Sequence, residues 1–439
     1  MARGRSSPLS AATELAEPIK LESVKRPHTG RPRVVIVGGG FGGLTAARSL
    51  KDAPVEITLI DRRNHHLFQP LLYQVATASL SPADIAQPIR EILRKQKNVK
   101  VQLDDVTGVD AENKLVRLAT GETVPYDYLI LAAGARHSYF GRDEWEKDAP
   151  GMKSLDEALD IRSKILMAFE SAEVAESDAE RRKLLTFVVI GGGPTGVELA
   201  GAIAEIARHS VAHDFRNFDP STARVILLEA LPKILPMFPD KLSESAVRQL
   251  TDMGVTVRTG GMVTGIEPGV VHLGDDAIEA QTIIWAAGVA ASPIGKTIGV
   301  PVDRAGRVPV TPTLTVEGHP DIFVIGDQAA FIKPDGKPLP GVAPVAQQQG
   351  HFVGVNIARA VRGEAMLPFE YKDRGSMATI GRNRAIAQVG RFCFSGFPAW
   401  VAWSAVHVVN LSGYRNRAIV ALRWAWSYIT YHRGARLIE

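Results

Sequence analysis

Cysteine is almost absent, because the 439 residues include only Cys393. A single cysteine can form neither an intramolecular disulfide nor a CxxC redox pair, and it cannot build a cysteine-based metal site. Enzymes that carry electrons or sulfur on several cysteines are therefore excluded, and we expect no metal centre.

An excess of charge is also lacking, since 51 basic and 47 acidic residues leave a formal net charge of +4. The whole molecule is therefore not the polycation that nucleic-acid binding favours. Acids are missing only near the C-terminus, where residues 374–438 contain nine arginines and no lysine. The nine are Arg374, Arg382, Arg384, Arg391, Arg415, Arg417, Arg423, Arg433 and Arg436. A basic segment that also carries tryptophan indicates contact with an anionic surface.

Long hydrophobic runs are absent as well. Residues 1–30 mix Ser, Pro, Arg and Glu without an apolar stretch of signal-peptide length, and their acids are atypical of a transit peptide. We expect this segment to be a disordered tail. Residues 392–414 carry no formal charge, but their Ser, Gly, Pro, His and Asn residues make a poor membrane span.

Aromatic residues are interleaved with arginine in the C-terminal segment and favour an interfacial, amphipathic anchor over a spanning helix. The aromatic residues expected at the membrane surface are Trp400, Trp403, Trp424, Trp426, Tyr428 and Tyr431. From about Met366 we therefore predict a separate C-terminal module. A dimer interface or a core helix is the alternative role for this segment.

A β-branched run at residues 33–37 leads into a glycine-rich turn, a helical pattern and a second strand. Gly38, Gly40 and Gly43 fit GxGxxG, in which the glycines allow a tight turn, close approach of a pyrophosphate, and close packing of helix on strand. Asp61 follows 23 residues after Gly38, where it can accept a hydrogen bond from a ribose hydroxyl. A bland glycine turn is the alternative, but strand, helix and acid together predict nucleotide binding.

The same series recurs 153 residues later, with Gly191, Gly193 and Gly196 as the glycines and Glu229 as the acid. The acid lies 38 residues after the first glycine, so we expect a lengthened helix or an added loop within residues 207–222. An acid in this position favours the free 2′-hydroxyl of NADH over the 2′-phosphate of NADPH. A surface glutamate at a strand end is the alternative.

Two such folds imply two nucleotides. A nicotinamide alone cannot divide a hydride into single electrons, whereas a flavin can. This suggests a flavin in one fold and NADH in the other, and the residues alone do not decide which fold holds which.

Five segments together resemble the type II, non-proton-pumping NADH:quinone oxidoreductases, which are flavoproteins with two dinucleotide-binding domains. The segments are 37–43, 64–76, 191–201, 324–327 and 377–381, and the similarity covers about residues 31–439. The resemblance implies an α/β fold with two nested Rossmann-like domains of the glutathione-reductase-like type and a C-terminal amphipathic helical module that binds membranes. The implied domains are FAD-binding at 31–150 and 289–365, NADH-binding at 151–288, and membrane-anchoring at 366–439.

The resemblance also implies which residues bind the cofactors. Those for FAD are Gly38, Gly40, Phe41, Gly42, Gly43, Asp61, Gln74, Ala133, Gly134, Gly326 and Asp327. Those for NADH are Gly191, Gly193, Thr195, Gly196, Glu229, Ala287 and Gly288. Asp327 resembles the aspartate that binds the ribityl chain in this family, and an Asx turn is its alternative.

Glu198 and Gln348 are the catalytic residues that the resemblance implies. It places Glu198 between nicotinamide, flavin and quinone to relay protons; a helix-stabilising charge in a first turn is the alternative. Gln348 matches the second glutamine of the family's AQxxxQ segment, whereas Pro344 replaces the first, so one polar contact to the quinone is missing. The neighbouring Gln347 and Gln349 are expected to face solvent.

The implied reaction oxidises NADH through FAD and reduces membrane quinone to quinol at the cytoplasmic face of the cell membrane. The expected partners are quinone, an anionic membrane surface and, as one option, a second copy of the chain. A sulfide:quinone oxidoreductase or a disulfide reductase would need more cysteines. A ferredoxin or rubredoxin reductase would have no use for the aromatic basic tail. A non-catalytic NAD(H) sensor stays open until a flavin is seen to bleach with NADH.

Overall fold

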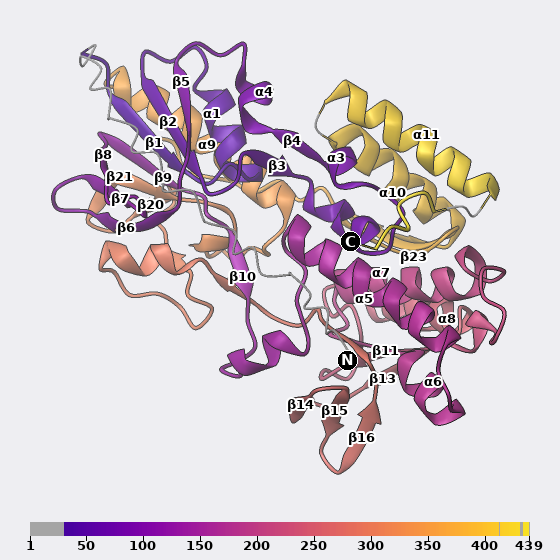
Figure 1. Cartoon of the computed structure of the whole chain (residues 1–439). Coiled ribbons are helices and arrows are strands. Elements are labelled where there is room, and N and C mark those ends of the chain that lie inside the picture. Colours follow the sequence, from indigo (N-terminus) through magenta and orange to yellow (C-terminus); the bar gives the residue numbers. More distant parts are fainter. Residues whose placement is uncertain (1–29, 412, 431–432, 439) are drawn as a thin grey trace, which may run out of the picture. The chain divides into compact units, whose positions relative to one another are not determined.

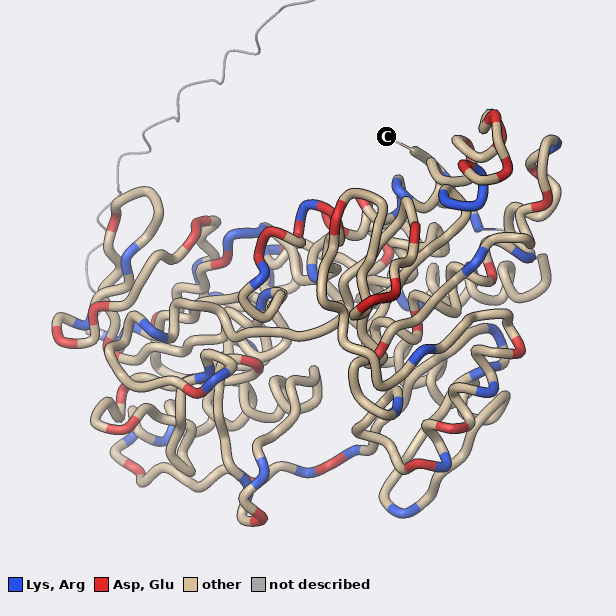
Figure 2. Tube along the Cα trace, turned by 90° about the horizontal axis from the view of Figure 1, so that it is seen from below, with Lys and Arg blue, Asp and Glu red and all other residues tan. Residues whose placement is uncertain are grey.

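The computed structural model describes residues 30–411, 413–430 and 433–438 (Figure 1). Residues from Pro32 onward form one compact unit. The tail expected at residues 1–30 lies outside the described residues, apart from Gly30. Acidic and basic residues are interspersed over most of the folded chain (Figure 2).

The first of the two main sheets has six strands and is parallel except at one edge. In spatial order they are β20 (Thr315–Val316), β21 (His319–Val324), β9 (Tyr128–Leu131), β1 (Arg33–Val37), β2 (Glu56–Asp61) and β5 (Val99–Leu103). Side chains of a strand alternate between faces. Val34 and Ile36 therefore pack under α1 (Phe41–Ser49) and α9 (Ala343–Val361), while Val35 and Val37 pack on the other side. That side is covered by a small sheet of β6 (Val106–Asp110), β7 (Leu115–Leu118) and β8 (Thr123–Pro125).

The second main sheet repeats this arrangement with four parallel strands. They are β13 (Val255–Thr259), β12 (Arg224–Glu229), β11 (Thr186–Ile190) and β17 (Thr282–Trp285). On one side Phe187 and Val189 join a core with helices α5 (Leu155–Glu173), α7 (Pro194–Glu205) and α8 (Asp240–Asp252). On the other side, Val188 and Ile190 face a small sheet of β14 (Gly265–Glu267), β15 (Val270–Leu273) and β16 (Asp276–Glu279).

The second fold is inserted into the first, because β11 to β17 lie in the chain between β9 and β21. The predicted fold class, two nested dinucleotide-binding folds, is thereby confirmed. The long spacing to Glu229 has the expected cause: α7 continues into a π-helical turn at Ile206–Ser210, and a loop and a short 3-10 helix at Pro220–Thr222 follow.

The C-terminal segment forms a three-stranded antiparallel sheet and two helices. These are β23 (Ser376–Gly381), β24 (Arg384–Val389), β25 (Phe392–Ser395), α10 (Phe397–Asn410) and α11 (Tyr414–Thr430). Among the described residues, no helix has the length and hydropathy needed to cross a bilayer.

This segment is not the separate module that its composition suggests. Its residues Ile380, Trp403 and Val420 belong to the same buried cluster as Val197 and Ala200 of α7. The helix lies so close to β23 that a Cβ at Gly201 would collide with the carbonyl oxygen of Ile380. The C-terminal segment therefore completes the core of the second fold.

Candidate active site

The glycine-rich loop of the first fold leaves an open cradle at the N-terminus of α1. Gly38 has φ +103°, and a Cβ there would collide with the carbonyl group of Ala132. A Cβ at Gly43 would collide with the carbonyl oxygen of Gly38, so helix and strand touch at this point. Around Gly40, by contrast, no atom lies within 4 Å of the Cβ position. The free amides at this helix end and the space beside them fit a pyrophosphate.

Asp61 is held at the edge of this cradle by backbone amides. Its Oδ2 accepts a hydrogen bond from the amide of Gly39 at 2.6 Å, and its Oδ1 accepts one from Arg63 at 2.7 Å. A carboxylate fixed in this way keeps lone pairs for a ribose hydroxyl.

The second fold repeats the cradle atom for atom. A Cβ at Gly196 would collide with the carbonyl oxygen of Gly191, while the space at Gly193 is open. The Oε2 of Glu229 accepts a hydrogen bond from Gly192 at 2.6 Å, and its Oε1 accepts one from Leu231 at 2.8 Å. Both folds can therefore hold a dinucleotide by the same contacts.

Further predicted cofactor residues follow the carboxyl ends of neighbouring strands. Gly134, Gly288 and Gly326 lie two or three residues after the ends of β9, β17 and β21 and have φ of +68°, +78° and +68°. The chain can turn sharply there and leave room beside the strand ends, where parallel sheets bind ligands. Ala133 and Ala287 precede two of these glycines, and Asp327 follows the third.

Two buried glutamines that sequence analysis missed hold these turns in place. Gln328 accepts a hydrogen bond from the amide of Ala133 at 2.7 Å, and Gln349 accepts one from the amide of Gly326 at 2.7 Å. Gln349 was expected to face solvent, but it lies on the face of α9 that packs against the sheet and is 1% exposed. The only sequence feature that could indicate the burial of Gln349 is its position on the face of α9 that carries the other buried residues. Three consecutive glutamines hide which of them lies on that face.

Lys153 is a further residue that sequence analysis missed. It interacts electrostatically with Asp327 and with Glu157. Burial lowers the pKa of Lys153, and these two carboxylates oppose the shift. The carboxylate of Asp327 lies beside Gly341, at the end of the loop that leads into α9. A cation, a carboxylate and the N-terminus of α9 thus lie near the end of β21, where the resemblance places the flavin.

Glu198 lies one turn inside α7, where the helix meets β23. Burial raises the pKa of its carboxyl group well above the usual value, against a hydrogen bond from the amide of Thr379 that lowers it. Tyr73 of α2 (Leu72–Ala76) is also buried, and burial raises its pKa, with the charge of Glu198 adding to the shift. Burial therefore favours the protonated, neutral form of Glu198, and this carboxyl group interacts with the hydroxyl of Tyr73.

Gln74 has both of its polar atoms in contacts within the chain. Its Nε2 donates to the hydroxyl of Tyr73 at 2.9 Å, and its Oε1 accepts from the indole of Trp424 at 2.8 Å. The residue thus connects α2 to α11. Its contact with a cofactor stays a prediction.

The glutamines of α9 lie on different sides of the helix. Gln348 forms two hydrogen bonds with the backbone of Lys372, at 2.9 and 3.0 Å, on the outer side of the helix. Gln347 instead lines a cavity beside Phe41 and His66. Pro344 occupies the first turn of α9. No contact in the described part of the chain joins Gln348 to Glu198, and its catalytic role stays a prediction.

Several arginines of the basic segment pair with carboxylates of the two folds. Arg433 is 7% exposed; it contacts Glu205 of α7 at 3.0 Å and donates to the carbonyl oxygen of Thr77 at 2.6 Å. Arg423 contacts Asp84 at 2.6 Å. Two further pairs are Arg436 with Asp214 and Arg384 with Asp252. Part of the basic charge therefore stabilises the fold and does not face a partner.

The aromatic residues of the C-terminal segment include both buried and exposed side chains. Trp403 is 2% exposed and stacks on Trp424, so the interfacial position expected for Trp403 is wrong: α10 turns it into the core. Trp426 and Tyr428 are exposed, while Tyr431 lies outside the described residues. Exposed apolar side chains accompany them on β25, α10 and α11. They are Phe392, Phe397, Val401, Val406, Val409, Leu422 and Ile429, and together with Trp426 we call them the apolar surface.

Comparisons with known proteins agree with this geometry. The family model of the pyridine nucleotide-disulphide oxidoreductases matches residues 32–350. The type II NADH:quinone oxidoreductase NdhA of Mycobacterium tuberculosis is 49% identical over 428 residues, covering 93% of this chain and 90% of that protein. A second such enzyme of that organism, Ndh, is 46% identical, covering 92% and 89%.

Solved structures share the fold at lower identity. The structure of NDH2 from Plasmodium falciparum in complex with NADH has a TM-score of 0.84 at 21% identity, covering 93% of this chain and 100% of that one. The sulfide:quinone oxidoreductase of Aquifex aeolicus has a TM-score of 0.71 at 19% identity, covering 88% and 92%. The chain therefore belongs to the pyridine nucleotide-disulphide oxidoreductases and, among them, to the type II NADH:quinone oxidoreductases.

Proposed function

We propose that the chain binds FAD in the first fold and NADH in the second, oxidises NADH, and reduces quinone at a membrane surface. The observation that carries the proposal is the duplicated cradle, in which Asp61 and Glu229 are fixed by the same two backbone contacts. Two cradles of this kind accommodate a resident dinucleotide and an exchanging one. Bound FAD would supply the step from hydride transfer to electron transfer.

The residues around the flavin site have separable tasks. The amides at the start of α1 would bind the pyrophosphate, and Asp61 the adenosine ribose. Lys153 and the N-terminus of α9 supply positive charge near the end of β21, which favours negative charge on a bound ring system. Burial favours the protonated form of Glu198, which would hold a proton that a quinone oxygen requires on reduction.

The apolar surface supports the membrane part of the proposal. Its eight large apolar side chains on β25, α10 and α11 are all exposed, and such a concentration of exposed apolar residues in one segment is typical of an interaction surface. Because a long-chain quinone stays in the bilayer, the enzyme must meet it there, and we propose peripheral attachment through this surface. Attachment at the cytoplasmic face and association of two chains also stay predictions.

The single cysteine favours NADH over sulfide as the donor. Cys393 is exposed on β25, whereas transfer of sulfur needs several cysteines at the flavin. No observation favours a protein electron carrier as the acceptor.

Anaerobic stopped-flow spectroscopy tests the proposal. We expect bound flavin to lose its yellow absorbance when NADH is added and to regain it when a quinone analogue is added. Sodium sulfide in place of NADH should leave the flavin oxidised. A flavin that NADH does not reduce, or that quinone does not reoxidise, would overturn the proposal.

A further inference from the structure

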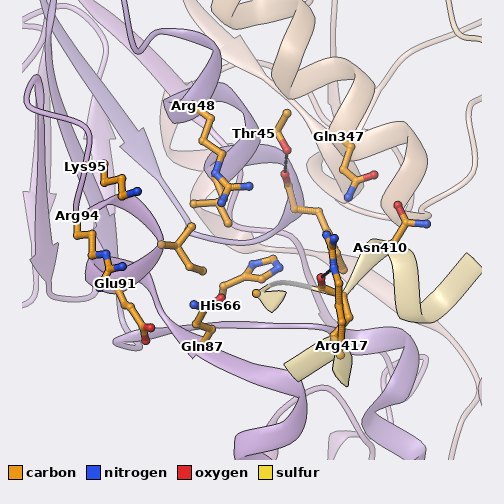
Figure 3. Close-up of a pocket in the computed structure, with 15 residues that line it drawn as sticks. Thr45, Arg48, His66, Gln87, Glu91, Arg94, Lys95, Gln347, Asn410 and Arg417 are labelled. Atoms are coloured by element: carbon orange, nitrogen blue, oxygen red, sulfur yellow. Dashed lines mark hydrogen bonds between the residues drawn. The ribbon is translucent and has the colours of Figure 1, made fainter. Parts of the chain in front are cut away.

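A cavity of about 440 Å³ lies beside α1, between the first fold and the junction of α10 and α11. Figure 3 shows side chains from α1, from the region of α4 (Ile89–Leu93), from α9 and from the α10–α11 junction around it. The site described above does not use most of these residues. We call this space the basic cavity.

The lining of the basic cavity is cationic and polar. Arg48, Arg94, Lys95 and Arg417 line it, with Glu91 as the single acid. Neutral polar side chains, among them Gln87 and Asn410, make up much of the remaining wall (Figure 3). Four cations against one carboxylate favour an anionic occupant, and an apolar quinone ring would fit this lining poorly.

Three of the four cations have no counter-ion among the described residues. Arg48, Arg94 and Lys95 form no ion pair with any carboxylate that the structure describes, whereas the arginines near the chain end pair with Glu205, Asp84 and Asp214. Burial lowers the pKa of Arg48, and no carboxylate opposes the shift. Arg48, Arg94 and Lys95 are nevertheless exposed, so their charges are accessible to a bound anion.

The cavity lies beside the apolar surface. Asn410 and Leu411 line the cavity, and Val406 and Val409, 43% and 65% exposed, lie on the same last turn of α10. An occupant with a charged end in the cavity could therefore lay an apolar chain along these valines. This combination of charge and apolar area is that of a phospholipid.

We propose that the basic cavity binds the phosphate of an anionic phospholipid headgroup, with Arg48 and Arg94 as phosphate ligands and the acyl chains along Val406 and Val409. The inference deepens the proposed function, because it names the lipid class that the membrane-bound enzyme would hold. Free phosphate shares the headgroup chemistry but lacks the chains. It therefore serves as the comparison that distinguishes the two sources.

The test is isothermal titration of the FAD-loaded full chain with dihexanoyl phosphatidylglycerol below its micelle concentration. We expect saturable binding of one lipid per chain and weaker binding of glycerol 3-phosphate and of inorganic phosphate. Arg48→Gln and Arg94→Gln should each weaken lipid binding by about tenfold to a hundredfold, the range for loss of a hydrogen bond to a charged group. FAD content, read from the absorbance, should not change.

Lys97→Gln is the matched control. Lys97 is exposed, follows the same helix and carries the same charge, but does not line the cavity. It should change binding by less than about fivefold, since a lone exposed charge contributes about 1 kcal/mol or less near an anionic surface. An equal loss in Lys97→Gln would mean diffuse attraction and would overturn the proposal.

Two other outcomes also decide the question. Inorganic phosphate that binds as tightly as the lipid would show a free-phosphate site, and the lipid assignment would fail. Displacement of the lipid by a soluble quinone would assign the cavity to the quinone path. Because the titration uses monomeric lipid and no turnover, the proposed function could fail in its own test while this one succeeds.

Discussion

The carboxylates of Asp61 and Glu229 accept hydrogen bonds from equivalent backbone amides of the two folds but bind different nucleotides in our proposal. Glu229→Gln keeps an acceptor for Gly192 or Leu231 and removes the charge that repels a 2′-phosphate. We expect the ratio of kcat/KM for NADH over NADPH to fall by about tenfold or more, the effect of one contact to a charged group. Steady-state kinetics with both nucleotides measure it.

Asp61→Asn is the matched control, because it makes the same change in the other cradle. It should weaken FAD retention and leave the preference between NADH and NADPH unaltered. If instead Asp61→Asn changes the nucleotide preference and Glu229→Gln does not, the assignment of the two folds is reversed.

Burial keeps Glu198 protonated at a pH at which an exposed glutamate is ionised. A proton donor with a raised pKa is active below that pKa and is lost as the pH rises through it. Glu198→Gln should therefore slow quinone turnover by about 10²–10⁴-fold and remove the corresponding decline of kcat at high pH. Flavin reduction by NADH, followed by stopped flow, should be little changed. A quinone pH profile identical to that of the unaltered enzyme would restore the simple helix-charge interpretation.

At the scale of elements, the start of α5 depends on one carboxylate. Glu157 accepts hydrogen bonds from the amides of Lys153 and Ser154 and lies 3.2 Å from Nε2 of His137. Burial would raise the pKa of Glu157, but the contacts with His137, Lys153 and Ser154 outweigh it and lower the pKa to about 2. Because the folded pKa lies below the ordinary value of 4.5, this stabilisation is complete above about pH 4.5 and is lost as the pH falls toward 2.

Glu157→Gln should therefore lower the stability of the FAD-loaded enzyme at pH 7 by about 0.5–2 kcal/mol, the usual effect of a lost cap. The difference in Tm should narrow as the pH drops below 4.5, as followed by circular dichroism. Glu180→Gln is the control, since Glu180 holds the same position in α6 (Asp178–Leu184) but is exposed and has a single amide partner. Equal losses in both variants at every pH would contradict the argument.

Elements whose cause is local could be predicted from the sequence, and contacts between distant segments could not. The strand, glycine turn and acid lie within residues 33–61 in one fold and 186–229 in the other, so their pattern predicts both cradles. Lys153 and Gln328 instead gain their roles from Asp327 and Ala133, which are 174 and 195 residues away. Trp403 carries an interfacial composition, yet the direction of α10 decides its burial. The sequence of an amphipathic segment shows which of its residues are apolar, but it does not show which neighbouring element covers them.

At the scale of the molecule, the C-terminal segment is needed for the fold as well as for a membrane. A chain that ends at residue 365 would lose Ile380, Trp403 and Val420 from the main core and leave Glu205 without Arg433. We expect it to aggregate or to lose FAD, because large apolar groups and a charge partner are removed together. Expression followed by gel filtration and flavin absorbance measures this.

Substitution on the apolar surface separates attachment from folding. The double variant Val409→Ser with Ile429→Ser changes exposed side chains only, so FAD content and NADH oxidation with a soluble acceptor should persist. Flotation with anionic vesicles should decrease.

For the chain that ends at residue 365, a product that stays folded and active would show that the shared core is dispensable.

Helix α7 contributes to three parts of the molecule: the cradle of the second fold, the site of Glu198 and the contact with the C-terminal segment. Its first residues form the cradle proposed for NADH, Glu198 lies one turn on, and Gly201 and Glu205 contact β23 and Arg433 within about 10 Å of that carboxyl group. A C-terminal segment taken from a relative would need a backbone that packs against Gly201 and an arginine that pairs with Glu205. Recombination near Met366 that replaces the C-terminal segment with that of a relative would therefore disrupt the fold. Changes in the C-terminal segment and in α7 must accompany one another during evolution.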